Sequence, residues 1–262
     1  MQEIIITTVV IGVIGLIIGI ALVAAGKKFY VAVDEKAIAV RECLSGNNCG
    51  ACGYAGCDAV AAAIAAGDAP ANACPVCSAD AVAKIGGIMG VEAEAAQRKT
   101  AQVKCSGDCE HTSAKCNYVG IEDCRAAALA GLNTGSCTFG CLGYGSCVKV
   151  CTYDAIHVVN GVAKVDTSKC VGCGMCAKAC PKGLIDVVRA DRTFVVQCSN
   201  KDRGPAVKKV CSAGCLGCGA CVKQCEHDAI HLEGNLAYID YDKCVGCGKC
   251  AEKCPAKNIV RQ

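Results

Sequence analysis

The chain contains no tryptophan, and aromatic residues make up only 4% of its 262 residues. Large aromatic side chains supply much of the apolar area that ordinary proteins bury. A chain so poor in them cannot build a large conventional core from big side chains. We therefore expect something other than side-chain packing alone to hold this chain together.

Several functional motifs are missing as well. No phosphate-binding glycine loop or G-x-G-x-x-G fingerprint stands before a helix, and no nucleophile–base arrangement is recognisable. Lysine and arginine are dispersed rather than gathered into a nucleic-acid-binding stripe. The sequence thus argues against nicotinamide or flavin binding, substrate bond cleavage and nucleic-acid binding by this chain itself.

Cysteine is abundant, with 28 residues, and 30 glycines accompany it. Cysteine at this density indicates disulfides or metal. Most of the cysteines stand two or three residues apart, which suits a shared metal centre better than long-range disulfides. Structural zinc sites usually show two separated pairs, whereas C-x2-C-x2-C followed by C-P is typical of bacterial [4Fe–4S] ferredoxins. One such run comprises Cys170, Cys173, Cys176 and Cys180.

An uncharged stretch covers residues 4–25, and a helix of this length spans roughly 33 Å, enough for the apolar part of a bilayer. Only Glu3 precedes it, and Lys27 and Lys28 follow it. A cleaved signal peptide would need positive charge before a shorter apolar run, so we predict a transmembrane anchor over residues 1–27. The positive-inside rule places the rest of the chain in the cytoplasm, where reducing conditions keep thiols free for iron.

Residues 28–97 are predicted to form a small cysteine-rich [4Fe–4S] domain. Its glycines allow close approach of the backbone to a cluster, and a short helix over 58–66, ended by Gly67, returns the chain toward its last ligand. One or two alanine-rich helices are expected within 79–97, followed by a polar linker over 98–104. Cys43 and Cys77 are interpreted as structural thiols. The four predicted ligands of this domain are Cys49, Cys52, Cys57 and Cys74.

The rest of the chain is an internal duplication at one constant offset in residue number, the offset that separates Cys180 from Cys254. It divides the chain into a first ferredoxin-like module with a cysteine-rich lead-in, 98–190, and a second module, 191–262. Each module contains a predicted hairpin, over 158–165 and 232–239, with asparagine and glycine at the turn. The cysteines that recur at this offset are Cys124, Cys137, Cys141, Cys147, Cys151, Cys170, Cys173, Cys176 and Cys180.

In two-cluster ferredoxins three cysteines of one group bind one cluster, and the fourth binds the other cluster. On this pattern the second module holds one cluster with Cys215, Cys218, Cys221 and Cys254, and another with Cys225, Cys244, Cys247 and Cys250. The first module holds one cluster with Cys151, Cys170, Cys173 and Cys176.

The remaining site of the first module departs from the pattern because Tyr144 stands where the second module has Cys218. We predict that Cys137 substitutes, with an empty site or a three-ligand cluster as the alternatives. The predicted set is Cys137, Cys141, Cys147 and Cys180. Five [4Fe–4S] clusters are thus expected, and a sixth cluster or a zinc is left open because further cysteines remain. These are Cys105, Cys109, Cys116, Cys124, Cys198 and Cys211.

The expected architecture is α+β: one N-terminal transmembrane helix, a small cysteine-rich domain and two tandem two-cluster ferredoxin-like modules. This order of parts, with the segment C-G-A-C-G-Y-A-G-C beginning at Cys49, resembles the B subunit of the Rnf complex in its clostridial form. The resemblance implies a single-pass member of a six-subunit complex in the cell membrane. That complex oxidises ferredoxin, reduces NAD and moves sodium ions or protons, and its B subunit accepts electrons from soluble ferredoxin for the partner subunits.

Two other interpretations remain open from the sequence. One is a membrane-anchored polyferredoxin that feeds another redox complex, such as a hydrogenase, and the other is a zinc-stabilised scaffold. The formal charge of +3 counts thiols as neutral. Five oxidised clusters at about −2 each would make the filled protein acidic, at about −7. Its dispersed basic residues suit either a docking face for an acidic ferredoxin or a solvated surface.

Overall fold

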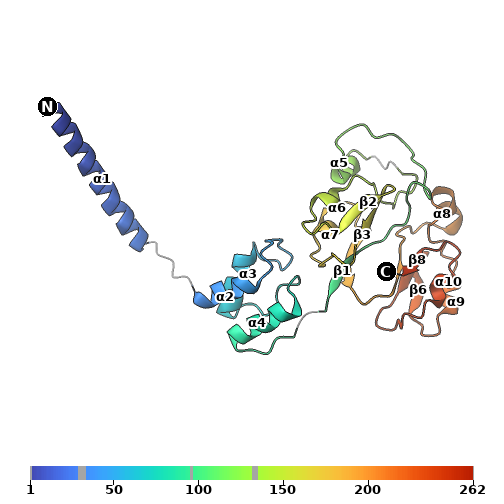
Figure 1. Cartoon of the computed structure of the whole chain (residues 1–262). Helices are drawn as coiled ribbons and strands as arrows, with labels where there is room; N and C mark the ends of the chain where they lie inside the picture. The colour runs from blue at the N-terminus through green and yellow to red at the C-terminus, as the bar shows by residue number, and fades with distance from the viewer. Residues whose placement is uncertain (1, 29–33, 95–96, 132–134, 262) are drawn as a thin grey trace.

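The computed structural model describes residues 2–28, 34–94, 97–131 and 135–261, and within the first helix it describes the side chains of residues 6 and 12–28. Figure 1 follows the chain from an N-terminal helix, through a helical domain, to two modules of short helices and strands. The mixture of helices and strands agrees with the predicted α+β class.

Helix α1 (Gln2–Lys28) covers the whole of the apolar stretch predicted to be helical. Part of the predicted membrane anchor, residues 2–5 and 7–11, lies outside the residues whose side chains are described. Among the described residues, no helix meets the length and apolarity required to cross a membrane. The transmembrane anchor therefore stays a prediction.

The helical domain, residues 34–94, consists of helices α2 (Glu35–Cys43), α3 (Cys57–Ala66) and α4 (Ala79–Met89). Its core is built from aliphatic side chains, as the scarcity of aromatics required, with Val40, Val60 and Ile85 fully buried. The predicted short helix is confirmed: α3 ends at Gly67, whose φ of 84° is the left-handed conformation that glycine adopts without strain. The predicted alanine-rich helix is confirmed as α4.

Module 1, residues 98–190, is followed by module 2, residues 191–262. The elements of module 1 are β1 (Lys99–Val103), α5 (Cys124–Leu129), α6 (Ser146–Lys149), β2 (Ile156–Val159), β3 (Val162–Val165), α7 (Met175–Ala179) and β4 (Ile185–Arg189). Those of module 2 are β5 (Phe194–Val196), α8 (Gly204–Val210), α9 (Ala220–Gln224), β6 (Ile230–Glu233), β7 (Leu236–Ile239), α10 (Lys249–Glu252) and β8 (Ile259–Arg261).

Each module contains two antiparallel strand pairs, β1–β4 and β2–β3 in module 1, and β5–β8 and β6–β7 in module 2. Both predicted hairpins are confirmed. Their turn residues, Asn160–Gly161 and Gly234–Asn235, all have positive φ, as a two-residue turn of the primed type requires. Each strand pair buries small aliphatic residues between the cysteine groups, so the hairpin and the terminal pair enclose the cysteines from two sides.

The structure corrects the predicted linker over 98–104. Residues 99–103 form β1, which pairs along its whole length with β4 and buries Ala101 and Val103. Strand β1 therefore belongs to module 1 and closes it, as β5 closes module 2.

The strand register also corrects the duplication at its N-terminal end. Val103 pairs with Ile185, and Val196 pairs with Ile259, the residue that matches Ile185 at the constant offset of the duplication. Val196 and Val103 are thus equivalent, although they lie further apart in the chain than that offset allows. Module 1 therefore carries an insertion, which lies between Cys105 and Cys137. The residue equivalent to Cys198 is Cys105, and the predicted equivalence of Cys124 and Cys198 is wrong.

Candidate metal centres

In module 2 each predicted ligand set lines one cavity. The first site of module 2 is a cavity bordered by the hairpin residue Ala237 and the C-terminal Ile259. The second site borders Phe194 and Ile239. The cysteines of the first site are Cys215, Cys218, Cys221 and Cys254, and those of the second are Cys225, Cys244, Cys247 and Cys250.

In module 1 the second site also has its predicted set around one cavity, namely Cys151, Cys170, Cys173 and Cys176. The first site differs from the prediction. Its cavity is lined by Cys124, Cys141, Cys147 and Cys180. Cys137, the predicted fourth member of that set, lines a different cavity together with Cys105. The structure thus brings a residue from the insertion region to the place that Tyr144 leaves without a thiol.

Cys124 is held there by its own helix start. Asp123 caps α5 by accepting the N–H groups of Arg125 and Ala126, at 2.8 and 3.2 Å. Ser146 donates its hydroxyl to Asp123 at 2.8 Å and accepts the N–H of Cys124 at 2.7 Å. The insertion region is therefore fastened directly to the helix that carries Cys147. An aspartate before a short alanine-rich run is the sequence signal that could have predicted this helix.

These cavities fit iron–sulfur clusters in their backbone chemistry. Sulfurs of the predicted ligands accept backbone N–H groups: Ala155 donates to Cys151, Ala229 to Cys225 and Ala101 to Cys170, at 3.3–3.4 Å. Such hydrogen bonds are how proteins stabilise and tune bound clusters. The four cavities have empty volumes between about 310 and 410 Å³. Among the described residues, no three His, Cys, Asp or Glu side chains gather closely enough to ligate one metal ion.

Glycines next to the ligands bring other backbone segments close. Gly172 has a φ of +67°, and a Cβ there would lie 2.6 Å from the carbonyl oxygen of Lys99. Gly217, in module 2, has a φ of +62°, and its Cβ would lie 2.7 Å from the carbonyl oxygen of Asn235. Only glycine combines this conformation with this approach, which explains the glycine-rich cysteine runs.

Two of the buried thiols in module 1 are held in their protonated form. Burial, aided by neighbouring thiols, raises the pKa of Cys147 to about 12 and the pKa of Cys176 to about 11. Metal ligation requires thiolates. A cluster bound at these sites would therefore displace one proton from each cysteine, and its assembly would be favoured by higher pH.

The helical domain carries the remaining predicted set, Cys49, Cys52, Cys57 and Cys74. Cys57 begins α3, and its N–H donates to the Asn48 side chain at 2.7 Å. Cys74 is buried nearby, and a hydrogen bond from the thiol of Cys77 lowers its pKa to about 6. Cys77, which the sequence analysis treated as a structural thiol, therefore stabilises a thiolate at a predicted ligand. Cys43 packs against the same core.

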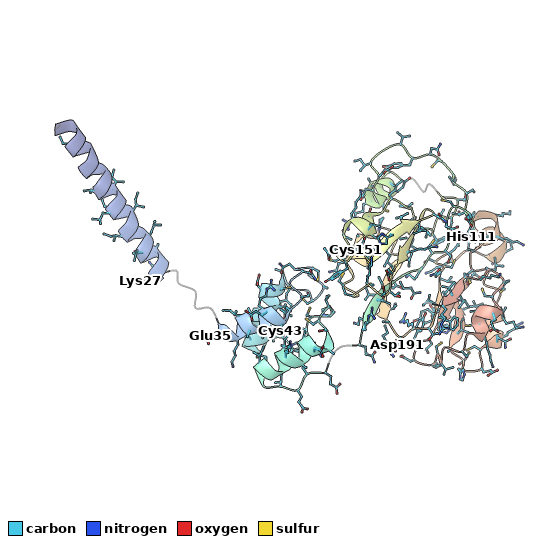
Figure 2. The ribbon with its side chains drawn as sticks, viewed as in Figure 1. Lys27, Glu35, Cys43, His111, Cys151 and Asp191 are labelled. Atoms are coloured by element: carbon cyan, nitrogen blue, oxygen red, sulfur yellow. The ribbon has the colours of Figure 1, made fainter. Side chains whose placement is uncertain are left out.

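The helical domain and module 1 meet at their cysteines. The Asn47 side chain donates to the hydroxyl of Tyr153 at 2.5 Å. After burial, the nearby thiol of Cys49 is a further cause of the raised pKa of Tyr153 and of Cys173. Figure 2 labels Cys151 at the edge of module 1 nearest the helical domain. The set of the helical domain is thus a direct neighbour of the second site of module 1.

Comparisons with known proteins agree with these cysteine sites. Three family models match the chain: "Putative Fe-S cluster" over residues 44–76, "4Fe-4S binding domain" over 163–186 and "4Fe-4S dicluster domain" over 214–258. The first of them lies in the helical domain, the second in module 1 and the third in module 2.

Several curated proteins are similar over most of the chain. The B subunit of the Na(+)-translocating ferredoxin:NAD(+) oxidoreductase complex of Acetobacterium woodii is 45% identical over 235 residues, 89% of this chain and 71% of that protein. The proton-translocating counterpart of Clostridium ljungdahlii is 40% identical over 92% of this chain and 85% of that protein. The B subunit of the ion-translocating oxidoreductase complex of Methanosarcina acetivorans is 37% identical over 94% of both. The chain therefore belongs to the family of B subunits of ion-translocating ferredoxin:NAD(+) oxidoreductase complexes, and it is an electron-transfer protein of that kind.

Proposed function

We propose that this chain relays electrons from soluble ferredoxin to partner subunits of a membrane complex through a row of cysteine-bound [4Fe–4S] clusters. A cluster of this kind accepts and donates one electron at a time at low potential. The proposed ligands are the sets of the helical domain and module 2, the second set of module 1, and the first set of module 1 with Cys124 in place of Cys137.

The observation that carries this proposal is the contact between the helical domain and module 1. Asn47 and Tyr153 fasten the two together beside Cys49 and Cys173. Electron transfer between centres falls steeply with distance, so two neighbouring sets suit a relay. The helical domain follows α1 in the chain, which makes its site the exit toward membrane-bound partners.

Module 2 provides the entrance at the other end of the row. Cys218 and Cys247 are exposed, whereas most members of the other sets are buried or half-buried. An exposed ligand gives a docked electron donor close access to the site. The relatives are named as members of ferredoxin:NAD(+) oxidoreductase complexes, so reduced ferredoxin is the proposed donor, and NAD reduction is assigned to other subunits of the complex.

The chain is proposed to be anchored in the cell membrane by α1, with its cysteine-bearing part on the cytoplasmic side. The lysines that end α1, Lys27 and Lys28, support this orientation. A single membrane helix provides no path for ions. The proposed role of this chain is therefore electron transfer, and ion transport is assigned to other subunits.

The test is Cys52→Ala in the assembled complex. We expect ferredoxin-driven NAD reduction to fall at least tenfold, because the exit site loses a ligand. The matched control is Cys116→Ala, which removes an exposed cysteine outside the proposed sets and should leave the rate unchanged. Subunit composition is checked by copurification in both variants. A normal rate in an intact Cys52→Ala complex would contradict the proposed route.

A further inference from the structure

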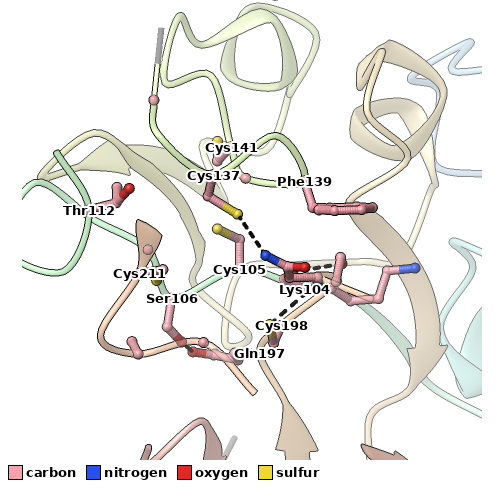
Figure 3. A pocket seen from close by; sticks show the side chains of 17 residues that line it. Lys104, Cys105, Ser106, Thr112, Cys137, Phe139, Cys141, Gln197, Cys198 and Cys211 are labelled. Carbon is pink, nitrogen blue, oxygen red and sulfur yellow. Dashed lines mark hydrogen bonds between the residues drawn. The ribbon is translucent and has the colours of Figure 1, made fainter. Parts of the chain in front are cut away.

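One cavity in the described chain is lined by Cys141, a member of the first set of module 1, and by four cysteines that belong to none of the proposed sets. It lies between module 1 and module 2, and Figure 3 shows it from close by. Two of these four cysteines come from each module. They are Cys105, which follows β1; Cys137, which precedes the first cysteine group of module 1; Cys198, which follows β5; and Cys211, which ends α8.

The four cysteines form two equivalent pairs. By strand register Cys105 corresponds to Cys198, since each stands two residues after the end of its strand. By the constant offset of the duplication Cys137 corresponds to Cys211. The cavity therefore lies where the two modules meet with approximate twofold symmetry. Each module contributes an equivalent pair of thiols to it.

The hydrogen bonds to the sulfurs repeat this relation. The Cys198 sulfur accepts the N–H of Asn200 at 3.5 Å and the N–H of Cys215 at 3.3 Å. The Cys105 sulfur accepts backbone hydrogen bonds from the equivalent residues, Gly107 and Cys141. Pairs of backbone donors aimed at a cysteine sulfur stabilise a thiolate, which is the form that binds metal.

Two hydrogen bonds also join the modules beside this cavity. Ser106 donates its hydroxyl to the side chain of Gln197 at 2.7 Å. The equivalent Ser199 donates to the carbonyl oxygen of Lys104 at 2.9 Å. These two bonds again relate equivalent residues, and they join the modules directly beside the four cysteines.

A buried amide completes the lining. Asn200 is only 2% exposed, and its side-chain nitrogen lies 3.6 Å from the sulfur of Cys137. Glycines leave the remaining room: a Cβ at Gly107 would lie 3.3 Å from the sulfur of Cys211, and one at Gly214 would lie 2.3 Å from the side chain of Val207. The cavity has an empty volume of about 440 Å³, slightly more than those of the proposed cluster sites.

We propose that Cys105, Cys137, Cys198 and Cys211 bind a sixth [4Fe–4S] cluster that joins the two modules. Each thiol would lose its proton on ligation, as at the other sites. The cluster would lie next to the first site of module 1 through Cys141 and next to the first site of module 2 through Cys215, because these residues donate to its ligands. Its role in the relay rests on the proposed function, but its presence does not.

The experiment measures iron, acid-labile sulfide and zinc on the anaerobically purified full chain and on two variants. We expect about 24 iron and 24 sulfide per chain, and no zinc, because each cluster contributes four of each. The Cys211→Ser variant should lose about four iron, whereas the control Cys116→Ser should keep all of them. A wild-type count of about 20 iron, an unchanged count in Cys211→Ser, or one zinc lost in that variant would overturn the proposal.

The wild-type count decides the matter even where Cys211→Ser misfolds. A second variant, Asn200→Leu, keeps all four thiols but removes the amide beside the Cys137 sulfur. It should retain about 24 iron and change the electron paramagnetic resonance spectrum of the reduced protein, and an unchanged spectrum would count against the site. Failure of the sixth site would still leave NAD reduction dependent on Cys52, whereas failure of the relay would leave the iron count intact.

Discussion

Modules 1 and 2 place four cysteines around their first cavity, but they take one of these cysteines from different parts of the chain. In module 2 three of the cysteines that line the first site come from one run, and Cys218 in that run is exposed. In module 1 the equivalent position is Tyr144, which packs on Tyr118 at 5.3 Å between ring centroids. The missing thiol comes from Cys124, which is buried. The position of a cysteine beside the cavity is thus retained in space, whereas its position in the chain is not.

The difference arises from the insertion that module 1 carries between Cys105 and Cys137. This insertion region is tied to the rest of module 1, since the N–H of Cys109 donates to the carbonyl oxygen of Asn160 at 2.9 Å. Module 2 has no counterpart in the described residues, and its chain runs from β5 through α8 directly to Cys215. Module 1 therefore has a buried thiol where module 2 has an exposed one, and a buried thiol suits an internal position in the proposed relay.

The largest expected effect comes from moving the fourth cysteine of module 1 from position 124 to position 144, where module 2 has its own. Cys124→Ser should cost module 1 its first cluster, about four iron per chain, because no other described thiol lines that cavity with Cys141, Cys147 and Cys180. The double variant Cys124→Ser with Tyr144→Cys should regain this iron, because the thiol returns to the position of Cys218. Iron and sulfide analysis of anaerobic protein measures both.

Cys218→Ser is the matching variant in module 2 and should also lose about four iron. If Cys124→Ser kept its full iron content while Cys137→Ser lost the cluster of the first site, the sequence-based set with Cys137 would be the correct one.

The second effect concerns equivalent glycines. Gly172→Ala and Gly246→Ala both place a side chain at a positive φ, which costs about 1–2 kcal/mol. At Gly172 the new Cβ also meets the backbone carbonyl of Lys99 at 2.6 Å, whereas at Gly246 it meets only the side chain of Thr193, with the hydroxyl at 2.8 Å and the Cβ at 3.1 Å. We expect losses of about 3 and about 1.5 kcal/mol.

The readout for these glycines is the temperature at which the visible absorbance of the anaerobic protein is lost, at one fixed heating rate. The expected decreases are about 9 °C for Gly172→Ala and about 4 °C for Gly246→Ala. A third variant, Gly183→Ala, has positive φ but open space around its Cβ, so it measures the conformational cost alone. Equal decreases for the first two would show that the backbone contact in module 1 is soft.

A smaller effect is expected at the contact between the modules. Ser106→Ala and Ser199→Ala each remove one hydrogen bond across the interface, worth about 1 kcal/mol. Because the two bonds relate equivalent residues, the single variants should have similar effects and the double variant should show their sum. Ser168→Ala, which breaks a bond within module 1 only, is the control. Hydrogen exchange of the segments around Lys104 and Gln197 should increase only in the interface variants.

Much of the molecule followed from local sequence patterns. The hairpin turn at Asn160–Gly161 and the helix end at Gly67 depend on residues that tolerate positive φ, which is a local property. The grouping of Cys225, Cys244 and Cys247 around one cavity matches the spacing rule for two-cluster ferredoxins. Each of these predictions needed only a short stretch or one known pattern.

The predictions that failed depend on contacts between distant segments. Strand β1 was predicted to be part of a linker because residues 98–104 are mostly polar, yet Thr100 and Gln102 are buried when β1 pairs with β4. Cys124 was aligned with Cys198 because a cysteine happens to stand at the constant offset of the duplication. The insertion becomes visible only from the strand register, in which Val103 and Val196 occupy equivalent positions. The cavity between the modules was likewise hidden, since its two pairs of cysteines come together only through that interface.

The smallest effect is predicted where the modules differ in charge. Lys104 forms an ion pair with Asp186 at 2.8 Å, whereas module 2 has Gln197 and Val260 in the equivalent places. The lysine and aspartate side chains are 32% and 49% exposed, so water screens their attraction. Lys104→Gln, which copies module 2, should therefore change the free energy of unfolding by no more than about 0.5 kcal/mol.

Salt dependence distinguishes a weak ion pair from none. The small loss caused by Lys104→Gln should shrink further at about 1 M salt, where surface charges are screened within a few ångströms. Asp186→Val, the other half of the exchange, serves as the matched variant, and the double exchange tests whether the pair contributes anything of its own. A loss above about 2 kcal/mol would mean that this charge pair, rather than the serine bonds beside it, holds β1 in place. An ion pair would then stabilise the module 1 side of the interface, whereas the module 2 side, which has no such pair at the equivalent position, would depend on hydrogen bonds alone.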